Sequence, residues 1–355
     1  MPAGATKLSR KSDAYRNVES ARASGRRSGD RAGAGTGRAS AVPGYQPRTY
    51  APASSPPPRA PRTVYRAAPF ARIADNGALR SRHPPVPTEI APPMSVPAPK
   101  LPSVLLTNDD GIDAPGLAVL EEVAAELAHE VWVVAPEHDQ SGTSHSISLH
   151  SPLRVSRRGE RRFGVLGTPG DCVVTAVRHL MADARPTLVL SGINRGANLG
   201  VETMFSGTVG AAMTGLLLGL PSIALSQAFS DRERVRWETA RTLAPRVIRQ
   251  LLAVSHDAPV CLNVNFPDVD AGVAGPLTVT RQGAGLVRGI GVVPEVDPRG
   301  FDYHWLRFER APREDAPDSE TTVVGSGRVS VTPLQFERTD ERVFAVLSAG
   351  LPSRA

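Results

Sequence analysis

Short apolar runs alternate with helical stretches from Ser103 to about residue 264, and this alternation restricts the fold more than any other feature. The runs are short and rich in Val, Leu and Ile, which is typical of strands buried on both faces. They lie at residues 103–107, 131–135, 162–166, 187–191, 221–226 and 260–264, with a partly alternating extended segment at 146–155. Helical patterns begin at Pro115, Asp171, Gly207 and Trp237. The order predicts an α/β fold, a parallel sheet flanked by helices.

The sequence pattern changes beyond Leu277: Gly and Pro separate shorter apolar runs, and helical periodicity becomes weak. Tyr303 to Phe308 and Arg328 to Pro333 read as strands. We therefore expect one folded unit over residues 101–355 whose C-terminal part, from about 277, is a β-rich subdomain or extension.

Residues 1–100 differ in composition from the rest of the chain. They hold 17 Lys or Arg, 5 Asp or Glu and 16 of the 33 prolines, whereas residues 101–355 hold 24 basic and 30 acidic residues. Such a segment buries too little apolar surface to offset its ordering entropy, so we predict a disordered basic extension. Its charge could hold nucleic acid, an anionic membrane or polyphosphate, and we expect nucleic-acid binding from no other part of the chain. The alternative is an extension without function.

No apolar run has the length of a membrane span or of a signal peptide's central region, so we expect a cytoplasmic protein without membrane contact. Cys172 and Cys261 are far apart and lie in apolar segments. They read as buried thiols. The histidines show no metal-spaced pair, which disfavours a zinc site.

Three polar loops follow predicted strands, and the carboxyl ends of parallel strands share one edge of a sheet. They are Asn108 to Gly111, His138 to His145 and Gly192 to Asn198. Asp109 and Asp110 converge only if the backbone turns, and Gly111 permits a turn. Two carboxylates with a hydroxyl and an amide oxygen from the other loops form an oxygen shell suited to Mg²⁺, Mn²⁺ or Ca²⁺. The alternative is a solvated Asp-Asp-Gly turn.

Helix starts supply candidate phosphate sites, because their free N–H groups and dipole favour an anion. Ser206-Gly207-Thr208 opens one helix, and Thr168 to Asp171 opens another; an ordinary cap explains either one equally well. His145 would stabilise phosphate charge or protonate a leaving oxygen, although a lone histidine is more often structural. Asp113 reads as a helix cap.

Taken together, the motifs resemble the SurE family of stationary-phase survival 5′-nucleotidases over roughly residues 102–335. They are LLTNDDGIDAPGL, VVAPEHDQSGTSHSISL, GTPGDCV, LVLSGINRGANLG, FSGTVGAAMTGLLLG, LNVNFPD, VDPRG and VSVTPL. The resemblance implies a Rossmann-like core, and one divalent metal, Mg²⁺ or Mn²⁺, per subunit. The ligands that it implies are Asp109, Asp110, Ser141 and Asn194. We assign phosphate contacts to residues of the same motifs: Asn108, Gly142, Thr143, Asn198, Ser206, Gly207 and Thr208.

The family hydrolyses nucleoside 5′-monophosphates, and several members accept 3′-nucleotides or short polyphosphate. Its members form homodimers or homotetramers that exchange C-terminal elements. We therefore expect metal-assisted hydrolysis by water, with Asp109, Asp110 and His145 as the catalytic side chains; attack by either aspartate is the competing route. A non-catalytic nucleotide- or polyphosphate-binding regulator with this fold is the main alternative. A haloacid-dehalogenase-type phosphatase needs a downstream lysine, and residues 101–355 contain none.

Overall fold

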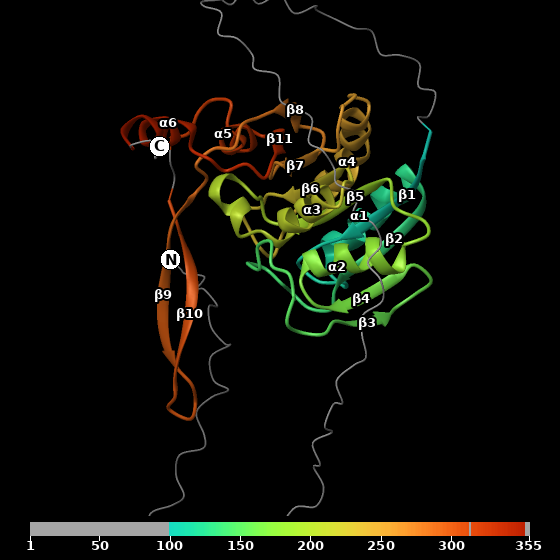
Figure 1. The fold of residues 1–355 in the computed structure, drawn as a ribbon, viewed down its shortest axis with the longest axis horizontal. Coiled ribbons are helices and arrows are strands. Elements are labelled where there is room, and N and C mark those ends of the chain that lie inside the picture. Colours follow the sequence, from blue (N-terminus) through green and yellow to red (C-terminus); the bar gives the residue numbers. More distant parts are fainter. Residues whose placement is uncertain (1–98, 312–313, 352–355) are drawn as a thin grey trace, which may run out of the picture. The chain divides into compact units, whose positions relative to one another are not determined.

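A computed structural model describes residues 99–311 and 314–351. The predicted basic extension lies outside these residues as far as residue 98. The described part contains a nine-stranded sheet in the order β3-β4-β2-β1-β5-β6-β7-β11-β8 (Figure 1). Its strands are β1 Leu101–Thr107, β2 Ala128–Pro136, β3 Arg154–Arg157, β4 Arg162–Leu166, β5 Leu188–Arg195, β6 Ser222–Gln227, β7 Cys261–Phe266, β8 Gly275–Val279 and β11 Arg328–Leu334.

The centre of the sheet is parallel, which confirms the predicted fold class. All pairings from β4 through β2, β1, β5 and β6 to β7 are parallel, whereas β3 and β11 pair antiparallel with their neighbours β4 and β7. Each predicted apolar run coincides with a strand, and the runs that begin at residues 187, 221 and 260 start one residue before β5, β6 and β7. The extended segment predicted at 146–155 is mostly loop, because only Arg154 and Val155 enter β3.

Several helices begin at a residue suited to a helix start, such as a proline in the first turn or a side-chain cap. The helices are α1 Pro115–Leu127, α2 Pro169–Thr175, η1 Ala176–Leu180, η2 Gly200–Met204, α3 Gly207–Leu217, α4 Trp237–Leu252, α5 Glu320–Gly325 and α6 Glu341–Gly350. Pro115 fits the first turn of α1, and Thr168 caps α2 in a reciprocal pair with Asp171. The expected cap at Asp113 is wrong: Ala114 holds that position, and the Asp113 side chain is 89% exposed.

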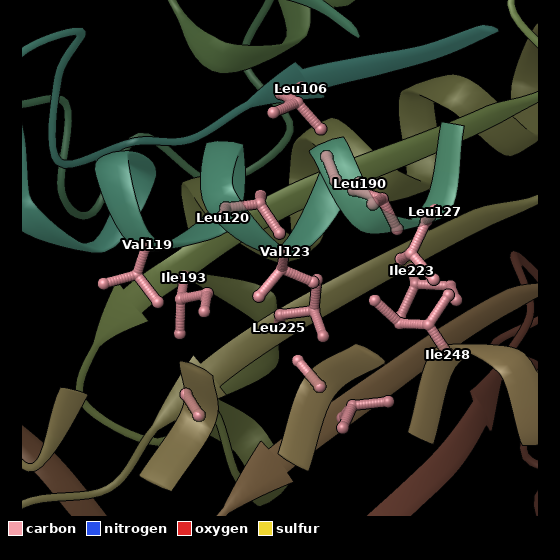
Figure 2. Packing of buried hydrophobic residues seen from close by; sticks show 14 of the residues in the cluster. Leu106, Val119, Leu120, Val123, Leu127, Leu190, Ile193, Ile223, Leu225 and Ile248 are labelled. Atoms are coloured by element: carbon pink, nitrogen blue, oxygen red, sulfur yellow. The ribbon is translucent and has the colours of Figure 1, made fainter. Parts of the chain in front are cut away.

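Two apolar layers hold the helices on opposite faces of the sheet. In Figure 2, Leu120 and Val123 of α1 lie against the sheet near Leu190 and Leu225. The same cluster takes in Ile248 of α4. Neighbouring side chains of a strand point to opposite faces, so Leu105 belongs instead to the cluster under α2 and α3. The core is therefore a doubly wound sheet with α1 and α4 on one face and α2 and α3 on the other.

The C-terminal part returns to the sheet after a detour. The chain forms β8, then a separate hairpin of β9 Val287–Val296 and β10 Asp302–Arg310, and then α5 and β11. Strand β11 lies between β7 and β8, so the β-rich part extends the main sheet (Figure 1). Within residues 99–311 and 314–351, no helix is both long enough and apolar enough to cross a bilayer.

Candidate active site

A cleft of about 780 Å³ opens at the carboxyl ends of the central strands. Strand β1 lies between β2 and β5, and the strand order runs outward in both directions from β1 and β5. Ligands of open α/β sheets bind where the order reverses in this way. Asp109 follows β1, and Asn194 lies at the end of β5 rather than in a loop beyond it, because the strand continues to Arg195. Six residues of the predicted site line the cleft: Asp109, Ser141, Gly142, Asn194, Asn198 and Ser206.

Asp109 is 4% exposed and contacts the first residues of α3. The Thr208 hydroxyl donates to its Oδ1, and the Thr208 backbone N–H also donates to this carboxylate. Burial nevertheless outweighs these bonds and raises the pKa of Asp109 to about 6, with a smaller contribution in the same direction from Asp110. A cation beside the pair would offset this cost.

Asp110 is less buried than Asp109 and faces a second, smaller cavity of about 300 Å³. Its Oδ2 accepts from the Arg195 backbone N–H at 3.1 Å, which links the loop after β1 to the end of β5. Burial raises the pKa of Asp110; the bond from Arg195 opposes that shift, and Asp139 adds to it. The backbone turns after the pair at Gly111, whose φ is 103°. Asp109 lines the larger cleft and Asp110 the smaller cavity, so their convergence on one metal stays a prediction.

Ser141 and Asn194 offer neutral oxygens to the cleft. The Asn194 side-chain Nδ2 donates to the Gly196 carbonyl at 2.8 Å, so its Oδ1 is the oxygen that remains for a ligand. The Ser141 backbone N–H donates to Asp139 Oδ1 at 2.8 Å, which orders the loop. Ser144 fastens the same loop to Phe205 through a backbone bond of 3.2 Å.

This donor set fits a hard divalent cation. Two carboxylates, one hydroxyl and one amide supply only oxygen, which Mg²⁺ and Mn²⁺ prefer. Within the described ranges, no group of three or more His, Cys, Asp and Glu side chains is arranged to hold a metal. A cation here would therefore take part of its shell from neutral protein oxygens, water or substrate.

Other predicted residues lie around the cleft rather than along its lining. Thr208 and Gly207 support Asp109: an added Cβ at Gly207 would lie 2.7 Å from Asp109 Cβ. Asn108 is buried and donates to Gly111 O at 2.8 Å. Thr143 Oγ1 donates to the Gln140 carbonyl, also at 2.8 Å.

His145 is absent from the residues that line the cleft. Its Nδ1 lies 3.4 Å from the Ser144 hydroxyl. Burial lowers the pKa of His145, and the positive charge of Arg338 adds to this effect. Its catalytic role stays a prediction.

Two sets of side chains around the cleft were not among the predicted site residues, although Asn265 lies in the motif LNVNFPD. The Asn198 backbone N–H donates to Asn265 Oδ1 of β7 at 2.8 Å, and Asn265 Nδ2 donates to the Asn198 carbonyl at 3.2 Å. Glu202 and Arg310 line the cleft as an ion pair, and Phe308 lies beside them. Each contact joins segments that are distant in sequence, so local pattern does not reveal it.

Comparison with known proteins identifies the family of the chain. The family model described as "Survival protein SurE" matches residues 104–288. The 5′-nucleotidase SurE 1 of Burkholderia lata is 63% identical over 248 residues, which cover 70% of this chain and 96% of the relative. The 5′-nucleotidase SurE of Azorhizobium caulinodans is 47% identical over 71% of this chain and 99% of its own length.

Among solved structures, the SurE protein from Aquifex aeolicus superposes with a TM-score of 0.60 at 35% identity, covering 70% of this chain and 99% of that chain. The polar loops that line the cleft thus lie within a match that spans nearly the full length of each relative. By sequence and by fold, this chain belongs to the SurE family.

Proposed function

We propose that this protein hydrolyses nucleoside 5′-monophosphates to nucleosides and inorganic phosphate with a divalent metal, Mg²⁺ or Mn²⁺. The observation that carries the proposal is the pair Asp109 and Asp110 at the switch point of the sheet, in a chain whose curated relatives are named 5′-nucleotidases. Buried like charges of this kind need a compensating cation. A cleft of about 780 Å³ also has the size that holds a ligand larger than phosphate.

Asp109, Asp110, Ser141 and Asn194 would hold the metal. When bound, such a cation neutralises charge on a phosphoryl oxygen and lowers the pKa of water. Ser206 caps α3, with its Oγ accepting from the Val209 N–H at 3.1 Å, and directs the start of the helix toward the cleft. Its dipole and amides favour the negative charge of a phosphate.

Water, rather than an aspartate, is the nucleophile that we propose. Asp109 is 4% exposed, and its Oδ1 already accepts the Thr208 hydroxyl, which leaves little access for attack on phosphorus. Mass spectrometry after rapid quenching tests this point: a phosphorylated Asp109 or Asp110 would refute the water route.

The activity is tested by phosphate release from AMP and GMP with Mg²⁺ or Mn²⁺, and with EDTA. Asp110→Asn should lower kcat/KM by at least about 100-fold, because loss of a ligand exceeds the 10- to 100-fold cost of an outer-shell change. Asp113→Asn is the matched control, since that side chain is 89% exposed in the same loop. Full activity in Asp110→Asn would refute the ligand assignment, and nucleotide binding without phosphate release would favour the non-catalytic regulator.

We also propose that the protein assembles through its C-terminal elements. Helix α6 has no buried residue, and Phe344, Val346 and Leu347 are 58%, 71% and 53% exposed. A ten-residue helix is marginal alone in water, so its apolar face needs a partner, for which we propose a second copy of the chain. Light scattering of Phe344→Ser should report a smaller assembly than the wild type; an unchanged mass would refute this role of α6.

A further inference from the structure

The cleft is lined by two chemically different sets of residues. One set is Asp109, Ser141 and Asn194, which suit a metal and a phosphate. The second set, here called the aromatic wall, is Phe205, Leu286 and Phe308, together with Phe229 and the Glu202–Arg310 ion pair. A phosphoryl group makes no use of aromatic rings, so this wall would bind another part of the substrate.

The ring positions on this wall are defined by contacts. The centroids of Phe205 and Phe308 are 5.3 Å apart with planes tilted by 55°, and the Arg310 guanidinium lies 5.3 Å from the Phe308 centroid. Both rings are only half-buried, so part of each remains open to the cleft. Phe205 directly precedes Ser206, which brings the aromatic wall next to the start of α3.

Glu202 and Arg310 add polar groups beside the rings. The Arg310 Nε lies 3.3 Å from Glu202 Oε1; the Glu202 side chain is 14% exposed and that of Arg310 is 53% exposed. A carboxylate has more acceptor sites than this bond uses, and a guanidinium has more donors. Together they present an acceptor and a donor to the edge of a planar ligand.

We propose that this wall is the nucleobase subsite, in which the base stacks on Phe308 with Phe205 beside it, and its edge meets Glu202 and Arg310. The inference rests on the proposed function and adds how the nucleoside part is recognised. Stacking of a base on an aromatic side chain is worth about 5- to 150-fold in affinity and tolerates any base, because every base has a π-face. The subsite therefore favours nucleotides over phosphate esters that lack a base.

The test compares AMP with ribose 5-phosphate, which carries the same kind of ester without a base. The ratio of their kcat/KM values should favour AMP by at least about 10-fold in the full-length wild type and fall by about 5-fold or more in Phe308→Ala. Phe308→Tyr keeps a ring and should retain the wild-type ratio. A ratio that stays at the wild-type value in Phe308→Ala would overturn the proposal.

Controls separate a local effect from a general one. Phe301→Ala removes a ring that is 68% exposed in the turn of the same hairpin and is absent from the cleft lining, so its ratio should match the wild type. If Phe308→Ala does not fold, Phe308→Leu asks the same question with apolar bulk retained. An equal fall of the ratio in Phe301→Ala would assign the effect to the hairpin as a whole and overturn the subsite.

Calorimetry with adenosine distinguishes failure of the subsite from failure of the proposed function. Adenosine has no phosphate, so its binding does not depend on hydrolysis. We expect binding to the wild type, with the dissociation constant raised at least about 5-fold in Phe308→Ala. Absence of phosphate release from every ester would refute the proposed function alone, whereas equal adenosine affinity in both proteins would refute the subsite alone.

Discussion

At the scale of single residues, the position of Asp109 is determined by its neighbours in α3. Thr208 donates to the carboxylate, and Gly207 allows the helix to approach its Cβ. The balance of burial against these bonds leaves the carboxyl with a pKa of about 6. Small changes at the start of α3 should therefore act on the site through Asp109.

Gly207→Ala tests this close approach. The new Cβ would lie 2.7 Å from Asp109 Cβ and 3.1 Å from Pro169 Cγ, so the carboxylate must shift. We expect a loss of about 1–3 kcal/mol in the free energy of unfolding and a fall of at least 10-fold in kcat/KM. Urea titration and phosphate release measure the two effects.

Gly272→Ala is the control, because nothing lies within 4 Å of its added Cβ. It should change stability by less than about 0.5 kcal/mol. Equal activity in both variants would show that the close approach at Gly207 does not position Asp109.

The sequence revealed the residues of the site whose signal is local. Asp109 and Asp110 stand out because two acids adjoin at the end of an apolar run, and Ser206 because it precedes a helix. Ser141 and Asn194 came from family resemblance. The bond from Thr208 to Asp109 spans 99 residues, and no spacing rule predicts such a contact.

At the scale of elements, β7 holds the loop that follows β5. Asn265 gives and receives one bond at the backbone of Asn198, and Asn263 donates to the same carbonyl at 2.9 Å. Asn198 in turn lines the cleft. Strand β7 therefore positions this part of the cleft lining through side-chain bonds to the backbone of Asn198.

Asn265→Ala should loosen this wall. It leaves the buried Asn198 N–H without its acceptor, which costs about 1–3 kcal/mol and lowers Tm by roughly 2–4 °C per kcal/mol. We expect KM for AMP to rise more than kcat falls. Gln335→Ala removes an exposed amide and serves as control; an unchanged Tm in Asn265→Ala would contradict the role of β7.

Glu320 of α5 ties the start of η2 to residue 283. It is fully buried and accepts from the Gly200 and Gly283 N–H groups, each at 2.6 Å. Burial raises the pKa of Glu320, and these bonds only partly oppose the shift. The folded state then binds the proton more tightly than the unfolded state, so this stabilising effect is full below the unfolded pKa and is lost as pH rises through the folded pKa.

We therefore expect the stability difference between wild type and Glu320→Gln to be largest near pH 4 and to shrink toward pH 7. Urea unfolding at several pH values measures it. Glu314→Gln, at an exposed site, should show no such trend. A difference that grows with pH would mean that the carboxylate form, rather than the protonated form, is favoured by folding.

Elements with strong patterns were predicted well from the sequence, and the others were not. The continuous apolar runs of the parallel strands and the caps of α2 and α3 are local signals. Residues 146–153 alternate like a strand but form a loop, which Ser148 fastens to Asp171 through a bond of 2.9 Å. The insertion of β11 between β7 and β8 was also missed, because pairing over such separations has no local pattern.

At the scale of the whole molecule, charge is divided between the two ends of the sequence. Residues 1–100 hold 17 basic and 5 acidic residues, and residues 101–355 hold 24 basic and 30 acidic residues. We expect removal of residues 1–98 to abolish retention on a heparin column at low salt and to change kcat/KM for AMP by less than about twofold.

The salt dependence gives this prediction its control. At about 0.5 M salt, charges are screened within a few ångströms, so the full chain and the shortened chain should elute together. A large fall in kcat/KM on removal of residues 1–98 would instead assign the extension to catalysis and contradict a folded unit that begins near residue 101.

Because β11 lies between β7 and β8, the order of synthesis determines when the sheet can be completed. Strand β8 joins the sheet through β11, which emerges from the ribosome about fifty residues later, and Glu320 arrives only shortly before it. Until β11 is made, β7 has no neighbouring strand on that side. Until Glu320 is made, the Gly200 N–H at the start of η2 lacks its acceptor. A chain that ends before residue 320 can thus form strands β1 to β7, yet it lacks the residues from Thr321 to Gly327 that complete the lining of the cleft.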